Sequence, residues 1–264
     1  MPAFTAKDVQ ALRRLTGVGM ADAKRALDEL GGDMDGAVQW LREKGISTSN
    51  KLEGRDASEG AVAAVRDGRV AALAQLRCET DFVAKNAEFV SLVDEIAARV
   101  AAEGEGAVAQ FTDAVEKLRT TLKENISIGR VVRLEATASQ LVDTYLHQQS
   151  GRGVNAVAIV LEGGTEALAH EIAVHIAFTK PPYLAREDVP AEDVAAERST
   201  LETISRNEGK PEAALEKIVE GRLNGWFKER VLLEQPYVRD EKHSIVQLLG
   251  GATIVAFAQV LIGS

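Results

Sequence analysis

The stretch at residues 60–77, GAVAAVRDGRVAALAQLR, decides the fold because it holds two strand-like runs with a turn signal between them. The runs occupy residues 60–66 and 69–77, and Asp67-Gly68 joins them. An Asp-Gly pair between two such runs is among the strongest short-range signals for a β-hairpin. The sequence therefore predicts an antiparallel hairpin here, and with it a fold that contains a sheet.

A helix is predicted after this hairpin, over residues 87–102. Its apolar side chains recur at helical spacing, so they would lie on one face and be buried together. A further helix is expected at 111–123, and strands are expected at 131–136 and 141–147. The residues expected on the buried face of the helix at 87–102 are Phe89, Leu92, Val93, Ile96 and Val100.

A second strand–turn–helix sequence occupies residues 154–178. The apolar run at 154–161 leads through a Gly-Gly turn into a helix at 166–178, which repeats the order of elements at 60–102. A repeated order of elements indicates internal duplication. We therefore expect an α+β fold with a core of two related α+β subdomains, each with an antiparallel sheet.

Residues 1–45 have the pattern of three short helices separated by glycine-containing turns. Thr5 is the expected N-cap of the first helix and Asp33 that of the third. Residues 46–58 carry turn-forming and charged residues without a period, which is typical of a linker. The side chains expected to face the core of this bundle are Val9, Leu12, Leu15, Met20, Ala23, Leu27, Leu30, Ala37, Val38, Trp40 and Leu41.

Residues 187–230 interrupt the α+β pattern with a predicted helical hairpin. Its apolar stripe is narrow and nearly heptadic, which favours a projecting antiparallel arm over an ordinary pair of surface helices. The stripe is expected to contain Val194, Leu201 and Ile204 on the first helix and Leu215, Ile218 and Val219 on the second. The predicted division of the chain is 1–45, 46–58, 59–140, 141–186 together with 231–264, and the insertion 187–230.

Composition excludes some classes of function. The chain has 31 Lys and Arg against 40 Asp and Glu, a net charge of −9, and only 5% aromatic residues. Nucleic-acid binders are usually basic and often stack bases on aromatic rings, so this balance disfavours nucleic acid as a partner. The one cysteine, Cys78, cannot form an internal disulfide, which favours a reducing, cytoplasmic location. The apolar run at 252–262 is too short to span a membrane, so no membrane association is expected.

The sequence offers little for catalysis. His170 and His175 are spaced i, i+5, and a helical zinc site needs two histidines at i, i+4 on one face. Gly17 and Gly19 resemble the start of a dinucleotide motif, but Asp22 stands where the third glycine belongs. Cys78 is read as a small core residue rather than a nucleophile. We therefore expect no catalytic residue, no metal and no cofactor.

Residues 77–86, RCETDFVAKN, resist such an ordinary explanation. They run from the end of a strand to the start of a helix, and they place Phe82 in what should be a loop. Leaving a Phe side chain in water costs about 1.5–3 kcal/mol relative to burial. Two interpretations remain open: Phe82 tucks under the following helix, or it is an exposed anchor for a pocket on another protein.

At this segment the sequence resembles the bacterial elongation factor Ts family. Several separated motifs support the resemblance in the same order along the chain. The matching segments are VQALRRLTGVGM at 9–20, TDFVAKN at 80–86, ENISI at 124–128, HEIAVH at 170–175 with Lys180-Pro181, VEGR at 219–222 and QPYV at 235–238.

The resemblance implies a fold and a function. The family's fold is an N-terminal UBA-like three-helix bundle, a core of two related subdomains and an inserted antiparallel coiled coil. Its function is guanine-nucleotide exchange on the translational GTPase elongation factor Tu. In that family the residues matching Asp81 and Phe82 insert near the Mg²⁺-binding region and loosen GDP, and GTP then displaces the factor.

The same resemblance implies which residues bind the partner. Thr80, Asp81, Phe82 and Val83 would form the inserted wedge, and Met20, Ile126 and His147 would make further contacts. The arm at 187–230 is expected to carry self-association or a secondary partner. The alternative function is an adaptor that uses the bundle and the arm as a scaffold without promoting exchange.

Overall fold

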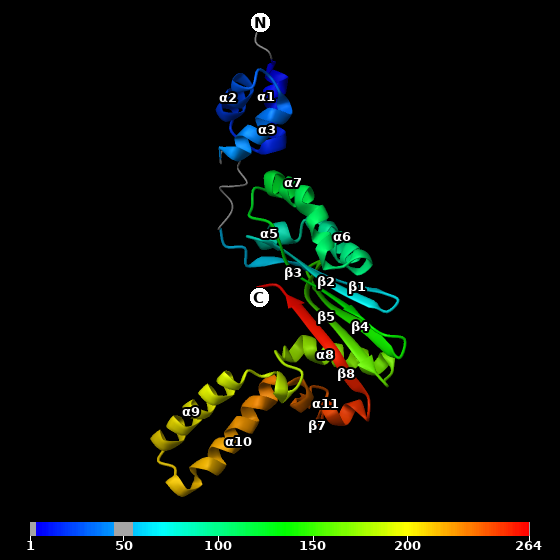
Figure 1. Ribbon diagram of the computed structural model, residues 1–264, viewed down its shortest axis with the longest axis vertical. Coiled ribbons are helices and arrows are strands. Elements are labelled where there is room, and N and C mark those ends of the chain that lie inside the picture. Colours follow the sequence, from blue (N-terminus) through cyan, green and yellow to red (C-terminus); the bar gives the residue numbers. More distant parts are fainter. Residues whose placement is uncertain (1–3, 45–54, 264) are drawn as a thin grey trace.

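The computed structural model describes residues 4–44 and 55–263. Its centre consists of two three-stranded antiparallel sheets stacked face to face, with a helix on each outer face (Figure 1). The predicted α+β class with antiparallel sheets is therefore confirmed. The first sheet has the order β1-β2-β3, from β1 (Glu59–Asp67), β2 (Val70–Cys78) and β3 (Ser127–Glu135). The second has the order β4-β5-β8, from β4 (Gln140–Gln149), β5 (Arg152–Glu162) and β8 (Thr253–Leu261).

The hairpin predicted at 60–77 is confirmed, but its turn is displaced by one residue. Asp67 pairs with Val70, so the two turn residues are Gly68 and Arg69 rather than Asp67 and Gly68. Gly68 has φ +56, whereas Arg69 keeps a negative φ. A positive φ at the first turn position alone suits glycine there, as in type II′ hairpins. The strand predicted at 131–136 also begins earlier, at Ser127.

Strand alternation explains why the central strands are apolar on both faces. Along β2, Leu73 faces the other sheet while Leu76 faces the outer helix, and β5 alternates in the same way. Central strands covered on both faces need continuous apolar runs. The layer between the sheets contains many small residues, among them Ala71, Ala156, Ala158 and Ala258.

The helices predicted at 87–102, 111–123 and 166–178 are present, and a further one-turn helix lies at 81–84, where the sequence predicted a loop. All five residues expected on the buried face of the helix at 87–102 are buried. On the second sheet, Ile172 and Ile176 are fully buried. The helices around the sheets are α5 (Asp81–Ala84), α6 (Ala87–Glu103), α7 (Thr112–Leu122) and α8 (Glu166–Thr179).

The duplication is present, and it includes a strand that the comparison of 154–178 with 60–102 left out. Strand β4 pairs with β5, so the second unit begins at Gln140, next to residue 141, where the second subdomain was expected to begin. The first unit is therefore β1-β2-α6-β3 and the second is β4-β5-α8-β8, with the long insertion placed before β8. The sequence order of strands does not reveal which strands pair. Two elements near the end were not predicted, β7 (Asp240–Ser244) and α11 (Ile245–Leu249); β7 pairs with β6 (Pro236–Tyr237).

The N-terminal part folds into three helices around a small core. Thr5 is the N-cap residue of the first helix, as expected, and its N–H and its hydroxyl both donate to Asp8 Oδ2 at 2.7 Å. Leu15 and Met20, expected to be buried, are 63% and 50% exposed. Most of the predicted linker at 46–58 lies outside the described residues. The three helices are α1 (Ala6–Thr16), α2 (Met20–Glu29) and α3 (Met34–Glu43).

Helices α9 (Ala191–Asn207) and α10 (Glu212–Arg230) lie side by side and extend away from the sheets (Figure 1). Leu215 and Val219 are buried as expected, but Ile204 is 41% exposed. Ser205 is buried in its place, and its hydroxyl donates to the Leu201 carbonyl at 2.7 Å. None of the helices in the described ranges is both long and apolar enough to cross a membrane.

Candidate functional site

The segment between β2 and α6 presents Phe82 to solvent. Thr80 caps the one-turn helix α5, since its hydroxyl accepts from the Val83 N–H at 3.4 Å. Asn86 caps α6 by accepting from the Glu88 and Phe89 N–H groups. Between these two caps Phe82 is 83% exposed, which rules out the interpretation in which it tucks under the following helix.

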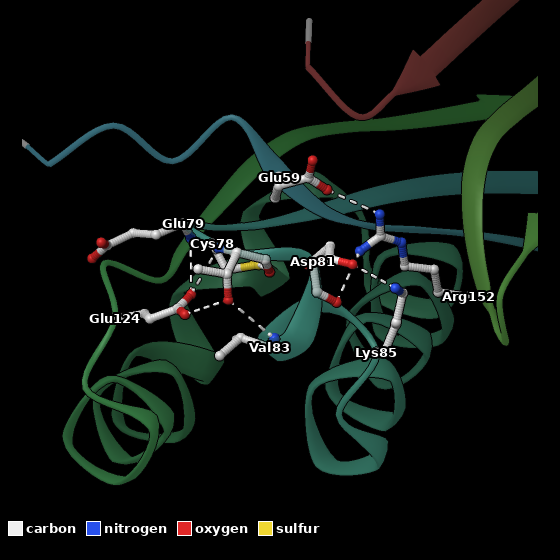
Figure 2. A network of polar contacts seen from close by, with 9 residues as sticks. Glu59, Cys78, Glu79, Asp81, Val83, Lys85, Glu124 and Arg152 are labelled. Atoms are coloured by element: carbon white, nitrogen blue, oxygen red, sulfur yellow. Dashed lines mark hydrogen bonds and ion pairs between the residues drawn. The ribbon is translucent and has the colours of Figure 1, made fainter.

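One side of this segment is held by the carboxylate of Glu124 (Figure 2). Its Oε2 accepts from the backbone N–H groups of Glu79 and Thr80 at 3.0 and 3.1 Å, and its Oε1 accepts from the Thr80 hydroxyl at 2.5 Å. In return, Glu79 accepts from the Asn125 N–H at 2.7 Å. Charge-assisted hydrogen bonds of this kind are stronger than neutral ones, so the entry to α5 is firmly positioned.

The other side of the segment is held by two cations. Lys85 Nζ lies 2.5 Å from Asp81 Oδ2, and this hydrogen bond is the main cause that lowers the pKa of Asp81. Arg152, from the start of β5, donates from Nη1 to the Asp81 carbonyl at 3.5 Å. Its Nη2 donates to Glu59 at 2.9 Å (Figure 2). The segment is thus held from both sides while the Phe82 ring remains outside.

Val83 and Cys78 anchor the segment from below. Val83 is half-buried and packs on the core beneath α6, so it supports the segment more than it presents a surface. Cys78 is fully buried, and burial raises the pKa of its thiol to about 12. Because the thiolate is the reactive form of cysteine, a thiol in this environment is inert, in line with its interpretation as a core residue.

The three other residues expected to bind a partner lie in different environments. Ile126 is fully buried in the same core as Ala84, so in this structure its side chain is not available for the direct contact that was expected of it. Met20 is half-exposed and lines a groove of about 490 Å³ between α1 and α2, together with Phe4 and Val9. His147 is exposed on β4 and stacks beside Tyr145.

Sequence reasoning missed Phe178, which is 76% exposed near the end of α8 and shares a pocket with His147. Helix α8 is apolar nearly all round, so helical periodicity gave no signal that this position faces outward.

The two histidines of α8 do not form a metal site. His170 Nδ1 lies 3.0 Å from Asp143 Oδ2, whereas His175 is fully buried and its Nε2 lies 2.9 Å from Gln235 Oε1. The Val238 N–H donates to His175 Nδ1, so this ring is held neutral, and burial lowers its pKa. Among the residues that the structure describes, no group of three or more potential ligands comes together.

These features define a class: a mixed α/β protein of two stacked antiparallel sheets whose most distinctive surface feature is a firmly held segment with an exposed aromatic ring. The model of the family described as Elongation factor TS matches residues 79–264 of this chain, beginning at this same segment.

Full-length relatives agree with this match. The elongation factor Ts of Clavibacter michiganensis subsp. michiganensis is 44% identical over 278 residues, covering 100% of both chains. That of Kineococcus radiotolerans is 42% identical over 278 residues, again with 100% of both covered. That of Micrococcus luteus is 41% identical over 281 residues with the same coverage. The chain therefore belongs to the elongation factor Ts family, a family of translation elongation factors.

Proposed function

We propose that this protein is a guanine-nucleotide exchange factor for the translational GTPase elongation factor Tu. It would bind the GDP form, insert Phe82 and Asp81 near the Mg²⁺-binding region, and so loosen GDP before GTP displaces it. The observation that carries the proposal is the 83% exposed Phe82 ring on a segment held by buried and charged contacts.

The geometry supports insertion because the segment is already ordered in the free protein. An interface anchor that is held in place loses little conformational entropy on binding. Aromatic side chains that enter a pocket commonly dominate the binding energy of an interface. The Phe82 ring gains the free energy of burial only when it enters the partner, so this gain can help to open the partner's pocket.

Exchange requires no bond chemistry from this chain. A protein that binds the nucleotide-free GTPase more tightly than the GDP form must weaken GDP binding by the same factor. A protein that bound both forms equally would shift nothing. Phe82 supplies a differential contact if its pocket exists only in the opened partner, and Asp81 would bring negative charge close to the metal's own oxygen ligands.

Phe82→Ala tests this proposal. We expect the GDP-release rate of the partner at a fixed factor concentration to fall about 30-fold, the equivalent of the roughly 2 kcal/mol typical of an anchor residue. Stopped-flow fluorescence with labelled GDP measures the rate. The matched control is Val246→Ala, which truncates an exposed apolar side chain on α11, and it should leave the rate unchanged.

Wild-type release with Phe82→Ala would contradict the wedge. Binding of the wild-type chain without faster release would favour the adaptor function instead. The other contacts, by Met20 and His147, would raise affinity for the same partner.

Several finer expectations belong with this proposal. The three N-terminal helices would form a UBA-like unit and α9–α10 a coiled coil, within the domain division predicted from the sequence. The location would be the cytoplasm, where translation factors act. Self-association through 187–230 stays a prediction, which light scattering on the wild-type chain and on a deletion of the arm would test.

A further inference from the structure

Arg152 is a charged side chain from the second sheet that reaches into the segment carrying Phe82. Like its neighbours in β5 it is buried, only 7% exposed, and it lies between Glu59 and Asp81 (Figure 2). Its Nε is also buried and makes no hydrogen bond to the described residues. A guanidinium is costly to remove from water, so such a placement requires contacts that compensate for it.

The two ends of the guanidinium contact different elements of the first unit. Nη2 donates to Glu59 Oε2 at 2.9 Å, at the first residue of β1. Nη1 donates at 3.5 Å to the Asp81 carbonyl, which also accepts the Lys85 N–H at 3.2 Å. The planar guanidinium can make both contacts at once, which a lysine ammonium cannot reproduce with the same geometry. Arg152 therefore shares its acceptor, the Asp81 carbonyl, with the backbone hydrogen bond that closes the single turn of α5.

The backbone beside Arg152 is itself fixed against the first sheet. A side chain at Gly153 would place its Cβ 2.1 Å from the Val62 carbonyl oxygen, so only glycine allows this approach of β5 to β1. Arg152 also pairs with Gln149 across the β4–β5 turn. The start of β5 is thus held closely against β1, and Arg152 connects it to α5.

We propose that Arg152 is a positioning residue for exchange, which holds α5 so that Phe82 points outward in the orientation required for insertion. The proposal rests on the function proposed above. According to this proposal, a residue of the second sheet, outside the 80–86 segment, determines how Phe82 is oriented. Small displacements of a positioned group can cost as much as about 100-fold in rate.

The test uses the full chain with Arg152→Met, which keeps much of the apolar stem. It leaves the half-exposed Glu59 without its ion-pair partner and the Asp81 carbonyl with the Lys85 N–H alone. We expect GDP release at saturating factor to slow about tenfold, with Arg152→Lys recovering part of the loss. The same substitution in a Phe82→Ala background should change the release rate less than twofold, because a residue that acts through Phe82 has nothing left to position. Glu59→Gln is the matched control, since it removes the ion pair and leaves the contact with Asp81 intact.

A merely structural role would give a different pattern. Arg152→Met would then lower Tm while leaving the saturated release rate of the folded protein at the wild-type value, or it would slow release equally with and without Phe82. Either result overturns the proposal. Hydrogen exchange at the Lys85 amide of the isolated protein gives a readout independent of the partner, and it should speed up in Arg152→Met.

If the wild-type chain fails to accelerate GDP release, the proposed function fails. Hydrogen exchange at the Lys85 amide then tests by itself whether Arg152 holds α5. Unchanged protection of this amide in Arg152→Met overturns the positioning role.

Discussion

The two ββαβ units have the same strand order and the same packing of a helix on the outer face, but they differ in how the central strand is connected to that helix. In the first unit β2 ends at Cys78 and α6 begins at Ala87, with the additional turn α5 between them. In the second unit β5 ends at Glu162 and α8 begins at Glu166. The two units share this scaffold, and the exposed Phe82 lies in the longer of the two connections.

The physical difference lies in the caps. The second connection contains Gly163 with φ +74 and then Thr165, whose hydroxyl accepts from the Leu168 N–H at 3.2 Å. One cap starts one helix, and the connection, Gly163-Gly164-Thr165, contains no apolar side chain. The first connection has two caps, Thr80 and Asn86, so the chain begins a helix twice. Phe82 lies between these two caps and is exposed. Function on a shared scaffold commonly resides in such connections.

The largest expected effect separates two phenylalanines of the first unit. Phe89→Ala removes a fully buried ring beneath α6 and should lower the free energy of unfolding by about 3–5 kcal/mol. Phe82→Ala removes an exposed ring and should change it by less than about 0.5 kcal/mol. Chemical denaturation followed by circular dichroism measures both. Equal losses would show that the longer connection is part of the core after all.

The second connection should be sensitive in its backbone. Gly163→Ala forces a β-carbon into a left-handed conformation and should cost about 1–2 kcal/mol of unfolding free energy. Gly225→Ala is the matched control, because an added Cβ meets nothing within 4 Å in helix α10. It should stabilise by about 0.4–1 kcal/mol. Thermal unfolding compares the two, and a neutral Gly163→Ala would remove the conformational distinction between the connections.

The smallest expected effect is a difference in pH dependence. Burial lowers the pKa of His175 in the folded second unit, so the unfolded chain binds more protons once the pH falls below about 6.5. Stability should therefore decline as the pH falls from 6.5 through the folded pKa, with a slope of at most about 1.4 kcal/mol per pH unit. His175→Gln should flatten this decline, and denaturation midpoints across the pH range measure it.

In the first unit the sign of the shift places the effect in a lower pH window. Lys85 lowers the pKa of Asp81, so the stabilising contribution of that carboxylate is present above its unfolded value of about 3.8 and is lost as the pH falls through the folded pKa. Asp81→Asn should thus leave the decline between pH 6.5 and 4 unchanged. If the decline in stability disappears with Asp81→Asn and not with His175→Gln, the pH dependence comes from the first unit and our assignment to His175 is wrong.

Local patterns predicted the elements well and their partners poorly. The hairpin at 60–77 and the buried face of α6 follow from residues close in sequence, and both are confirmed. The comparison of 154–178 with 60–102 left out β4, because the order of strands along the chain does not encode the pairing of β4 with β5. Strand β7, DEKHS, was missed because it has no apolar alternation. Ile204 was expected to be buried, but Ser205 is buried instead.

The sequence by itself determined which elements form, which family the motifs resemble, and that Phe82 stands in a connection with two open interpretations. Only the tertiary structure decided that the ring is exposed. The surface beneath α6 is filled by Phe89, Ile96 and the side chains of β2, whereas the Phe82 ring lies outside this core. Glu124 and Arg152, 44 and 71 residues away from the backbone groups of Thr80 and Asp81 that they hold, then fix the segment from opposite sides. Burial and long-range hydrogen bonds depend on what the rest of the chain brings to a position, and a local pattern carries no record of that.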